Sequence, residues 1–372
     1  MVILLGANYK VGQTAHFAYT ALQRMGVKTI PFTPTPDAPQ DWIKVAPDLD
    51  ILDLYNSLAE KPDAFFMIEG SVGAPFFPRR IEELPIPTAV WLYDNYLNFR
   101  WHKEMAALFD YPFFAQLNRA QLAEKYTRRS VHWLPFAADE EFHRDFNVER
   151  DIDIGYLGTI TEQKKQYFRQ FEASGLEVKT NERYLSYDEI GRFYSRCKLV
   201  YNILARRDLN VRAFEASCAG AVVVNQGWID EGSRLIFKDG ESMAYHNFTD
   251  APDICRRLLA DDAKRRRMGE NAKNILLSAH TYQSRMKTVL EKLAGGVTDE
   301  RMRLRSSFIM PVAEALTCAN RDFKWHDRAR AKIKEALGRS FLGTISYIAW
   351  HALWRVWEKA EKTVWSVGRA PV

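Results

Sequence analysis

The sequence predicts an α/β protein with two Rossmann-like domains that face a cleft, followed by a helical C-terminal extension. Short apolar strands alternate with helical segments along most of the chain, and a strand-helix-strand order begins twice. The last part of the chain differs from both units in composition. We therefore expect the domains at residues 1–144 and 145–295 and the extension at residues 296–372.

The first domain begins with a strand, a turn that contains glycine, and a helix. Residues 2–5 are apolar and end at Gly6, and a helix with apolar residues at helical spacing follows Gly12. Residues 27–32 are the next strand, so the order is that of a doubly wound sheet. Further strands are predicted at residues 64–68, 88–93, 113–116 and 131–134. Their alternation with helical or loop segments favours a parallel sheet.

The same order begins again after a charged linker at residues 145–151. A strand at residues 152–157 ends at Gly158 and is followed by a polar helix that carries Lys164. The elements predicted next are a strand at 177–180, a helix at 187–197, a strand at 199–203 and, closing the domain, an amphipathic helix at 282–293. Two such domains place a ligand cleft at the carboxyl ends of both sheets.

The segment at residues 208–225, DLNVRAFEASCAGAVVVN, combines a short helix with a strand of the buried type. Asn210 is a good helix N-cap, and Gly220 supplies the C-terminal stop. The apolar run at residues 221–224 is typical of a parallel strand that is covered on both faces. The segment therefore predicts a helix whose start lies beside the edge of the second sheet.

Charged side chains gather at the start of that helix. Arg206, Arg207 and Arg212 lie where free N–H groups and the helix dipole already favour an anion. Glu215 follows about one turn further in, and a carboxylate accepts hydrogen bonds from ribose hydroxyls. The pattern predicts a site for a nucleotide diphosphate. The alternative is an ordinary solvated helix face with exposed charges.

Composition and charge exclude several classes of protein. Of all residues, 47% are apolar, so the chain is globular. The four cysteines lie far apart without a CxxC pair, which argues against a zinc site or a disulfide framework and for a reducing compartment. From Arg301 onward there are 14 Lys and Arg but 6 Asp and Glu, so 38 basic and 41 acidic residues precede it. Because the basic excess belongs to the extension, we expect no nucleic-acid partner.

The chain carries no sequence signal for export or for membrane insertion. Its N-terminal apolar run is too short for a signal peptide and lacks preceding basic residues. No uninterrupted apolar stretch is long enough to span a bilayer. These features predict a cytoplasmic protein.

Several short motifs follow one another in a characteristic order. The first domain contains AVWLYDNY at residues 89–96 and HWLPFAAD at 132–139. The second contains DIGYLGT at 153–159, the segment at 208–225, KDGES at 238–242 and HTYQSR at 280–285. Together they resemble the GT-B glycosyltransferases, specifically the CgeB-like branch related to group 1 transferases, over residues 1–295.

The resemblance implies transfer of a hexosyl or related sugar from a nucleotide-activated donor to an acceptor hydroxyl. It implies no metal and no cofactor beyond the nucleotide sugar as co-substrate, and it favours retention of the anomeric configuration. The acceptor would be a glycan, a lipid-linked molecule or a protein. Glu215 would hold the donor ribose, and Arg212 and Asn210 would face the diphosphate. The backbone would approach donor or acceptor at Gly155, Gly158 and Thr159.

One position departs from the family pattern. Group 1 transferases often carry two glutamates eight positions apart, and the earlier position here is Arg207. An arginine at that place favours contact with phosphate over contact with the sugar ring. Leaving-group stabilisation would fall to Arg206, Arg207 and Arg212. For Lys164, a solvated basic face is the favoured interpretation.

The first domain supplies three candidates for a catalytic base or an acceptor ligand. Asp94 comes first because it follows directly after a strand and should open on the cleft. Glu69, next to Gly70, also follows a strand, and His102 is the third. Carboxylates at strand ends also cap helices or bind loop N–H groups. The acidic run at residues 48–53 is expected near a helix start and not in a metal-binding motif.

The role of the extension and the function of the protein each have alternatives. Residues 341–365 predict an amphipathic helix in which Trp350, Trp354 and Trp357 widen an apolar stripe flanked by basic residues. Packing on the body or on a second subunit is favoured. The alternative is peripheral contact with the inner face of a membrane, which would suit a lipid-linked acceptor. Two alternative functions are a nucleotide-sugar epimerase and a non-catalytic protein that binds a glycan or another partner.

Overall fold

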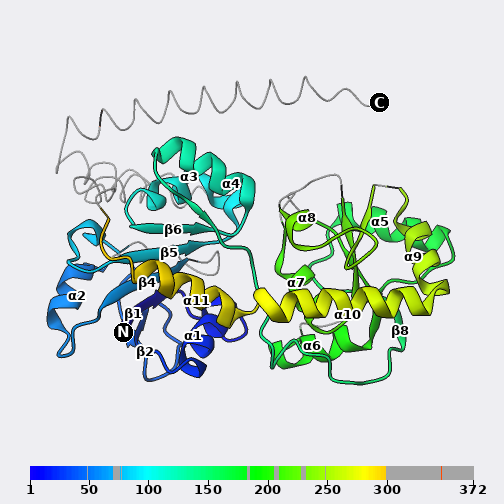
Figure 1. Cartoon of the computed structure of the whole chain (residues 1–372), viewed down its shortest axis with the longest axis horizontal. Helices are drawn as coiled ribbons and strands as arrows, with labels where there is room; N and C mark the ends of the chain where they lie inside the picture. The colour runs from blue at the N-terminus through cyan, green and yellow to red at the C-terminus, as the bar shows by residue number, and fades with distance from the viewer. Residues whose placement is uncertain are drawn as a thin grey trace.

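In the computed structural model, the chain forms two α/β domains that lie side by side (Figure 1). The structure describes residues 1–298, apart from 48, 70–75, 77, 182–184, 205–208, 228–231 and 248, together with residue 345. Each domain contains one parallel sheet with helices packed against it. The predicted pair of Rossmann-like domains is confirmed. The helix predicted at residues 341–365 lies outside the described residues except for Ile345.

The first domain is built on a seven-stranded parallel sheet with the order β3-β2-β1-β4-β5-β6-β7. Its strands are β1 (Val2–Ala7), β2 (Lys28–Thr33), β3 (Ile43–Lys44), β4 (Ala64–Glu69), β5 (Thr88–Leu92), β6 (Tyr111–Phe114) and β7 (His132–Trp133). The central strands are apolar and buried on both faces because helices cover both sides of the sheet. The strand order reverses between β1 and β4, where a doubly wound sheet opens a ligand crevice at its carboxyl edge.

Before the chain crosses to the second domain, the described part of the first domain contains five helical segments. They are α1 (Thr14–Arg24), α2 (Ile51–Ser57), the 3-10 turn η1 (Ile81–Glu83), α3 (Asn95–Ala106) and α4 (Leu117–Thr127). The acidic run at residues 48–53 marks the start of α2, as expected. The Asp50 carboxylate accepts the N–H groups of Leu52 and Asp53, both at 3.2 Å, and so caps the helix.

The second domain has a five-stranded parallel sheet with the order β12-β11-β10-β8-β9. Its strands are β8 (Ile152–Tyr156), β9 (Lys179–Thr180), β10 (Cys197–Asn202), β11 (Val222–Gln226) and β12 (Ala244–His246). Its helices are α5 (Glu162–Ala173), α6 (Tyr187–Arg196), α7 (Val211–Cys218), α8 (Ser233–Ile236), α9 (Ala251–Ala260) and α10 (Asp262–Ala279). Helix α6 begins with a reciprocal capping box between Ser186 and Glu189.

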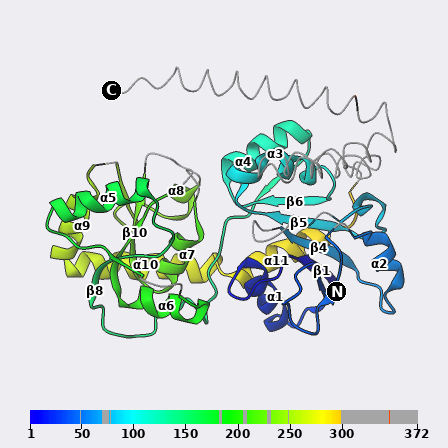
Figure 2. The same cartoon turned by 180° about the vertical axis from the view of Figure 1, so that it is seen from behind.

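Helix α11 (Tyr282–Leu293) corrects one expectation from the sequence. It does not close the second domain but returns to the first, where it packs on α1 and β5 (Figures 1 and 2). Met286, Val289 and Leu293 are buried in the core that they share with the first sheet. The amphipathic pattern identifies the helix but not the apolar surface that covers it.

The chain crosses between the domains at two adjacent places. Ala138 on the outward segment pairs with Thr281 on the returning one. The Ala138 N–H donates to the His280 carbonyl at 3.2 Å, and the Tyr282 N–H donates to the Ala138 carbonyl at 3.1 Å. Arg285 joins the same two segments, because its Nε donates to the Pro135 carbonyl at 2.8 Å. The two crossings therefore form one hydrogen-bonded connection.

We expect Arg285→Leu to destabilise the protein by about 2–4 kcal/mol, because it removes a buried donor and leaves carbonyl groups unpaired. The guanidinium is buried and donates also to the Phe136 carbonyl at 3.0 Å, and burial lowers its pKa to about 10. Urea unfolding followed by circular dichroism measures the change. Lys292→Ala, on the exposed face of the same helix, should change stability by less than about 0.5 kcal/mol. Equal stability of the two variants would contradict this role.

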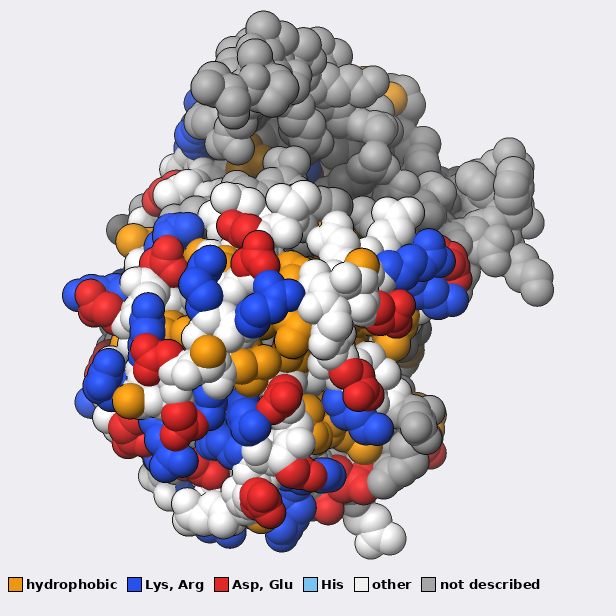
Figure 3. Space-filling view, turned by 90° about the vertical axis from the view of Figure 1, so that its right-hand side faces the viewer, with side chains coloured by type: hydrophobic (Ala, Val, Ile, Leu, Met, Phe, Trp, Pro, Cys, Tyr) orange, Lys and Arg blue, Asp and Glu red, His pale blue; other side chains and the backbone are white. Residues whose placement is uncertain are grey.

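Charges of both signs are mixed on the end of the second domain (Figure 3). Lys198 pairs with Asp153 at 2.6 Å, and Arg256 pairs with Asp253 at 2.6 Å. This face therefore carries no continuous basic surface among its described residues. None of the helices in the described part of the chain is both long and apolar enough to cross a bilayer.

Candidate functional site

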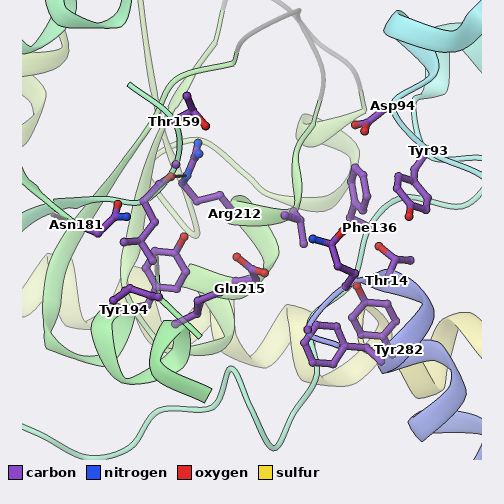
Figure 4. Close-up of a pocket in the computed structure, with 18 residues that line it drawn as sticks. Thr14, Tyr93, Asp94, Phe136, Thr159, Asn181, Tyr194, Arg212, Glu215 and Tyr282 are labelled. Carbon is purple, nitrogen blue, oxygen red and sulfur yellow. Dashed lines mark hydrogen bonds between the residues drawn. The ribbon is translucent and has the colours of Figure 1, made fainter. Parts of the chain in front are cut away.

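A pocket of about 670 Å³ lies between the two domains, and both of them line it (Figure 4). The first domain and helix α11 supply Gly12, Gln13, Thr14, Phe17, Tyr93, Asp94, Phe136 and Tyr282. The second domain supplies Leu157, Gly158, Thr159, Asn181, Leu185, Ile190, Tyr194, Val211, Arg212 and Glu215. The pocket has the size of a small-molecule site and lies at the carboxyl edges of the sheets.

Arg212 is held rigidly at the first turn of α7. Its Nε donates to the Leu157 carbonyl at 2.6 Å, and its Nη1 donates to Oδ1 of Asn202 at 2.6 Å. The guanidinium carbon lies 4.6 Å from the centre of the Tyr156 ring. Its Nη2 is directed at Gly158, since a Cβ built there would lie 2.5 Å from that nitrogen. The pocket therefore contains a fixed cation that keeps donor capacity.

Asn210 supports this arginine and does not cap the helix with its side chain. It occupies the N-cap position with extended backbone angles, as predicted from the sequence. Its side chain, however, forms a reciprocal amide pair with Asn202 at 3.0 and 3.1 Å, and makes no capping bond. Asn202, at the carboxyl end of β10, is a supporting residue that the sequence pattern did not single out.

Glu215 places a buried carboxylate in the pocket, with its side chain 12% exposed. Burial raises its pKa to about 7, and the Arg212 cation acts in the opposite direction. Its Oε1 lies 3.5 Å from Nε2 of His143. A carboxylate in this position accepts hydrogen bonds from ligand hydroxyls that enter the pocket.

The raised pKa of Glu215 predicts a dependence of stability on pH. The unfolded carboxyl titrates near pH 4.5 and the folded one near pH 7. The folded state therefore holds the proton more tightly, and stability falls as pH rises from about 4.5 to 7, by roughly 3 kcal/mol. Urea unfolding at pH 5 and pH 7.5 measures the slope, which Glu215→Gln should flatten. The same slope in both proteins would contradict the assignment.

The three predicted contact residues of the DIGYLGT motif differ in their position relative to the pocket. Gly158 lines the pocket with φ of 135°, a conformation that other residues rarely adopt. Thr159 also lines the pocket, and its carbonyl accepts the Lys164 ammonium at 2.7 Å. Gly155 is not among the described residues that line the pocket. It lies inside the sheet, where a Cβ would meet Sγ of Cys197 at 2.3 Å.

Of the other predicted cations, Lys164 alone lies within the described residues. The Lys164 ammonium donates to the Thr159 carbonyl at 2.7 Å, and Lys164 is not among the described residues that line the pocket. Arg206 and Arg207 lie outside the described residues. In the described part of the chain, no group of three or more His, Cys, Asp or Glu side chains is placed to hold a metal ion.

Asp94 faces the same pocket from the first domain (Figure 4). It follows β5 as the N-cap of α3 and has left-handed backbone angles, φ 55° and ψ 37°. The next residue is held in place, since the Asn95 N–H donates to Oε1 of Gln116 at 2.8 Å. The Gln116 N–H donates back to Oδ1 of Asn95 at 3.2 Å. The Asp94 carboxylate therefore lies at the start of α3, on the pocket wall opposite Arg212 and Glu215.

Glu69 and His102 are not brought to the pocket with Asp94. Both are buried, and neither is among the described residues that line the pocket. Nε2 of His102 lies 3.1 Å from Oε2 of Glu69, and Nδ1 pairs with Nδ2 of Asn95 at 2.8 Å. Burial holds the pKa of His102 well below its usual range. In the structure His102 contacts Asn95 at the start of α3 and Glu69 at the end of β4, and the catalytic role of both residues stays a prediction.

Aromatic residues complete the first-domain wall of the pocket. Tyr93, Phe136 and Tyr282 line it together with Thr14. Each aromatic residue lies within a motif of the sequence, AVWLYDNY, HWLPFAAD or HTYQSR. The motifs were informative, although spacing alone did not indicate that these side chains meet. Such a wall offers apolar ring faces beside a charged second-domain wall.

Comparison with known proteins agrees with this architecture. Residues 140–291 match the model of a family described as glycosyl transferase-like. No curated protein matches the chain in sequence. The matching segment begins just before the linker and covers the second domain with its Arg212 and Glu215.

Solved glycosyltransferase structures share the fold. One is a DNA-modifying β-glucosyltransferase studied with uridine diphosphoglucose, with a TM-score of 0.52 and 12% identity over 79% of this chain and 100% of that one. A sucrose-phosphate synthase of Thermosynechococcus elongatus has a TM-score of 0.53 and 11% identity, covering 79% and 98%. An Anabaena protein solved with UDP and glucose has a TM-score of 0.53 and 12% identity, covering 79% and 100%.

The chain therefore has the GT-B fold of glycosyltransferases, with a pocket between its two Rossmann-like domains. The resemblance seen in the sequence motifs is confirmed at the level of the fold and of the glycosyl transferase-like family model. Its second domain is the part that this family model matches.

Proposed function

We propose that this protein transfers a sugar from a nucleotide-activated donor to an acceptor hydroxyl. The observation that carries the proposal is the placement of Arg212 and Glu215 on one wall of the pocket and Asp94 on the other. A fixed cation and a carboxylate suit a nucleotide diphosphate, and an opposing carboxylate suits an acceptor hydroxyl. The family match over residues 140–291 supports a donor site in the second domain.

In this proposal, Arg212 and the start of α7 bind the diphosphate. Nη2 of Arg212 is directed at Gly158, and both residues line the pocket. The negative charge of the departing diphosphate grows in the transition state, and a prearranged cation in a partly enclosed site stabilises it. We propose that protein cations and the helix dipole perform this role without a metal ion. Glu215 accepts hydrogen bonds from the ribose hydroxyls.

The acceptor lies against the first-domain wall. Tyr93, Phe136 and Tyr282 provide apolar surfaces of the kind on which sugar rings or apolar groups pack. Asp94 orients the attacking hydroxyl or takes its proton. We infer from the motifs that the protein belongs to the CgeB-like branch and that transfer retains the anomeric configuration. A glycan, a lipid-linked molecule and a protein are the acceptor classes to be compared.

A donor panel tests the proposal. The full chain is mixed with UDP-, GDP-, ADP- and CMP-sugars, and thermal shift is measured together with release of the nucleotide and formation of product. We expect one base class to raise Tm by several degrees and to be hydrolysed slowly or transferred. Inversion of one stereocentre of the donor sugar without release of the nucleotide would favour the epimerase. If no nucleotide sugar stabilises the protein at millimolar concentration, the proposal is wrong.

We expect Gly158→Ala to weaken nucleotide binding about tenfold or more, because the added methyl group displaces Nη2 of Arg212 and strains the backbone. Isothermal titration with the nucleotide found in the panel measures this. The matched control is Gly175→Ala in the same domain. Gly175 also has a positive φ, 71°, but a Cβ there meets no described atom within 4 Å. Wild-type affinity in Gly158→Ala, or a similar loss of affinity in Gly175→Ala, would contradict the contact with Arg212.

A further inference from the structure

His143 is a buried side chain on the segment that connects the two domains. Its Nδ1 accepts the Asp139 N–H at 3.0 Å. Because a peptide N–H only donates, Nδ1 carries no hydrogen, and the proton of the neutral ring lies on Nε2. Burial lowers the pKa of His143 to about 4, which keeps the ring neutral at physiological pH. The tautomer is thus set by the backbone of the connecting segment.

The protonated Nε2 of His143 lies close to the Glu215 carboxylate. It lies 3.5 Å from Oε1 of that carboxylate and forms no hydrogen bond with any described residue. A buried N–H without an acceptor costs about 1–3 kcal/mol. Glu215 is the pocket carboxylate assigned above to the ribose, and a shortening of this contact by a few tenths of an ångström makes a hydrogen bond. The unused donor and the ligand-binding acceptor therefore lie within reach of each other.

The connection continues into the first domain through Asp139. The carboxylate of Asp139 is buried and accepts Nη1 of Arg24, in the last turn of α1, at 2.8 Å. It also accepts the N–H groups of Glu141 at 2.9 Å and Phe142 at 3.2 Å. These bonds hold the turn whose N–H fixes His143. A chain of contacts thus runs from α1 through the connecting segment to α7.

We propose that His143 is a positioning residue, which donates from Nε2 to Glu215 and fixes the carboxylate in the orientation that accepts the ribose hydroxyls. The inference rests on the proposed function for the ribose. It adds that ribose recognition by the second domain depends on a side chain held by the first. His143 itself does not line the pocket among the described residues, so its effect on ligand passes through Glu215.

Two substitutions of His143 distinguish the role of Nδ1 from the role of Nε2. In His143→Asn, Oδ1 takes the place of Nδ1 and still accepts the Asp139 N–H, but no group reaches Glu215. In His143→Gln, the amide nitrogen reaches the place of Nε2 and still donates. Both are made in the full chain and checked for folding by circular dichroism. Affinity is measured by calorimetry for UDP, GDP, ADP and CMP, and for the 2′,3′-dideoxy form of whichever of them binds.

We expect His143→Asn to weaken binding of the ribonucleotide about tenfold and to leave the dideoxy form within about twofold of the wild type. His143→Gln should recover most of the loss. In a Glu215→Ala background, His143→Asn should have no further effect. An equal loss for ribose and dideoxyribose forms, or wild-type affinity in His143→Asn, would overturn the proposal. If His143→Asn does not fold, a loss of affinity in folded His143→Gln is the overturning result.

A second measurement does not require a nucleotide. The pKa of the Glu215 carboxyl is followed by NMR titration of the full chain labelled with ¹³C glutamate, with Glu215→Gln used for assignment. Loss of the donor should raise this pKa by about half a unit in His143→Asn relative to His143→Gln. The same pKa in both variants would overturn the positioning role. Failure of all nucleotides to bind the wild type would instead contradict the proposed function alone.

Discussion

Asp94→Asn should lower turnover by about 10²- to 10⁴-fold and leave nucleotide affinity within about threefold of the wild type. The substitution removes the charge and the basicity of the carboxylate while it keeps its shape. Asparagine also tolerates the left-handed backbone angles found at this position, φ 55° and ψ 37°, so that α3 should start unchanged. The effect is therefore expected in chemistry and not in folding.

The measurement combines steady-state kinetics of the transfer reaction with calorimetric titration of the nucleotide. Asp37→Ala, an exposed carboxylate of the same domain, serves as the control and should leave both quantities unchanged. A rise in the acceptor KM without a fall in kcat would assign Asp94 to acceptor binding. Unchanged kcat and unchanged KM would exclude Asp94 from the site.

In contrast to Asp94→Asn, Glu215→Ala should act on binding: we expect it to reduce nucleotide affinity about 30- to 100-fold. The ribose hydroxyls would lose their buried acceptor, and a 30- to 100-fold loss corresponds to about 2–2.7 kcal/mol, the net contribution of about one hydrogen bond to a charged group. The protein should fold well, since the variant also removes a carboxylate whose pKa burial raises to about 7. A more stable protein that binds nucleotide poorly is a specific expectation.

Calorimetry with the ribonucleotide and its dideoxy form provides the test of Glu215→Ala. The dideoxy form should bind the variant and the wild type almost equally, because it lacks the groups that the carboxylate accepts. Glu162→Ala, an exposed glutamate at the start of α5, is the matched control. Wild-type affinity in Glu215→Ala would remove this residue from the donor site and leave Arg212 as its main polar group.

Local pattern predicts the elements of this fold well. The strand expected at residues 152–157 is β8 (Ile152–Tyr156), and the helix expected at residues 187–197 is α6 (Tyr187–Arg196). Both depend on short-range periodicity and on turn or capping residues, which act within a few positions along the chain. The amphipathic helix at 282–293 was also located from its pattern. Its pairing with α1 and β5 was not, since an apolar face specifies burial but not a partner.

Local sequence also predicts some residues of the candidate site and not others. Arg212 and Glu215 belong to one helix, so their common location followed from helical spacing. Asp94 and Glu69 are both carboxylates at the ends of neighbouring strands, and local sequence does not separate them. The structure does, because Asp94 lines the pocket while Glu69 is buried beside His102. His143 was not identified because its significance depends on Asp139 and Glu215 in three dimensions.

The sequence by itself determined that this protein has two Rossmann-like units in tandem and that a cation and a carboxylate stand at the start of one helix of the second unit. Periodicity, glycine turns and motif order are local properties, and they are encoded locally. The tertiary structure alone decided that Asp94 lines the same pocket as Arg212 and Glu215, and that Nε2 of His143 lies 3.5 Å from the Glu215 carboxylate. These contacts between distant segments depend on tertiary packing, which the spacing of residues along the chain does not specify.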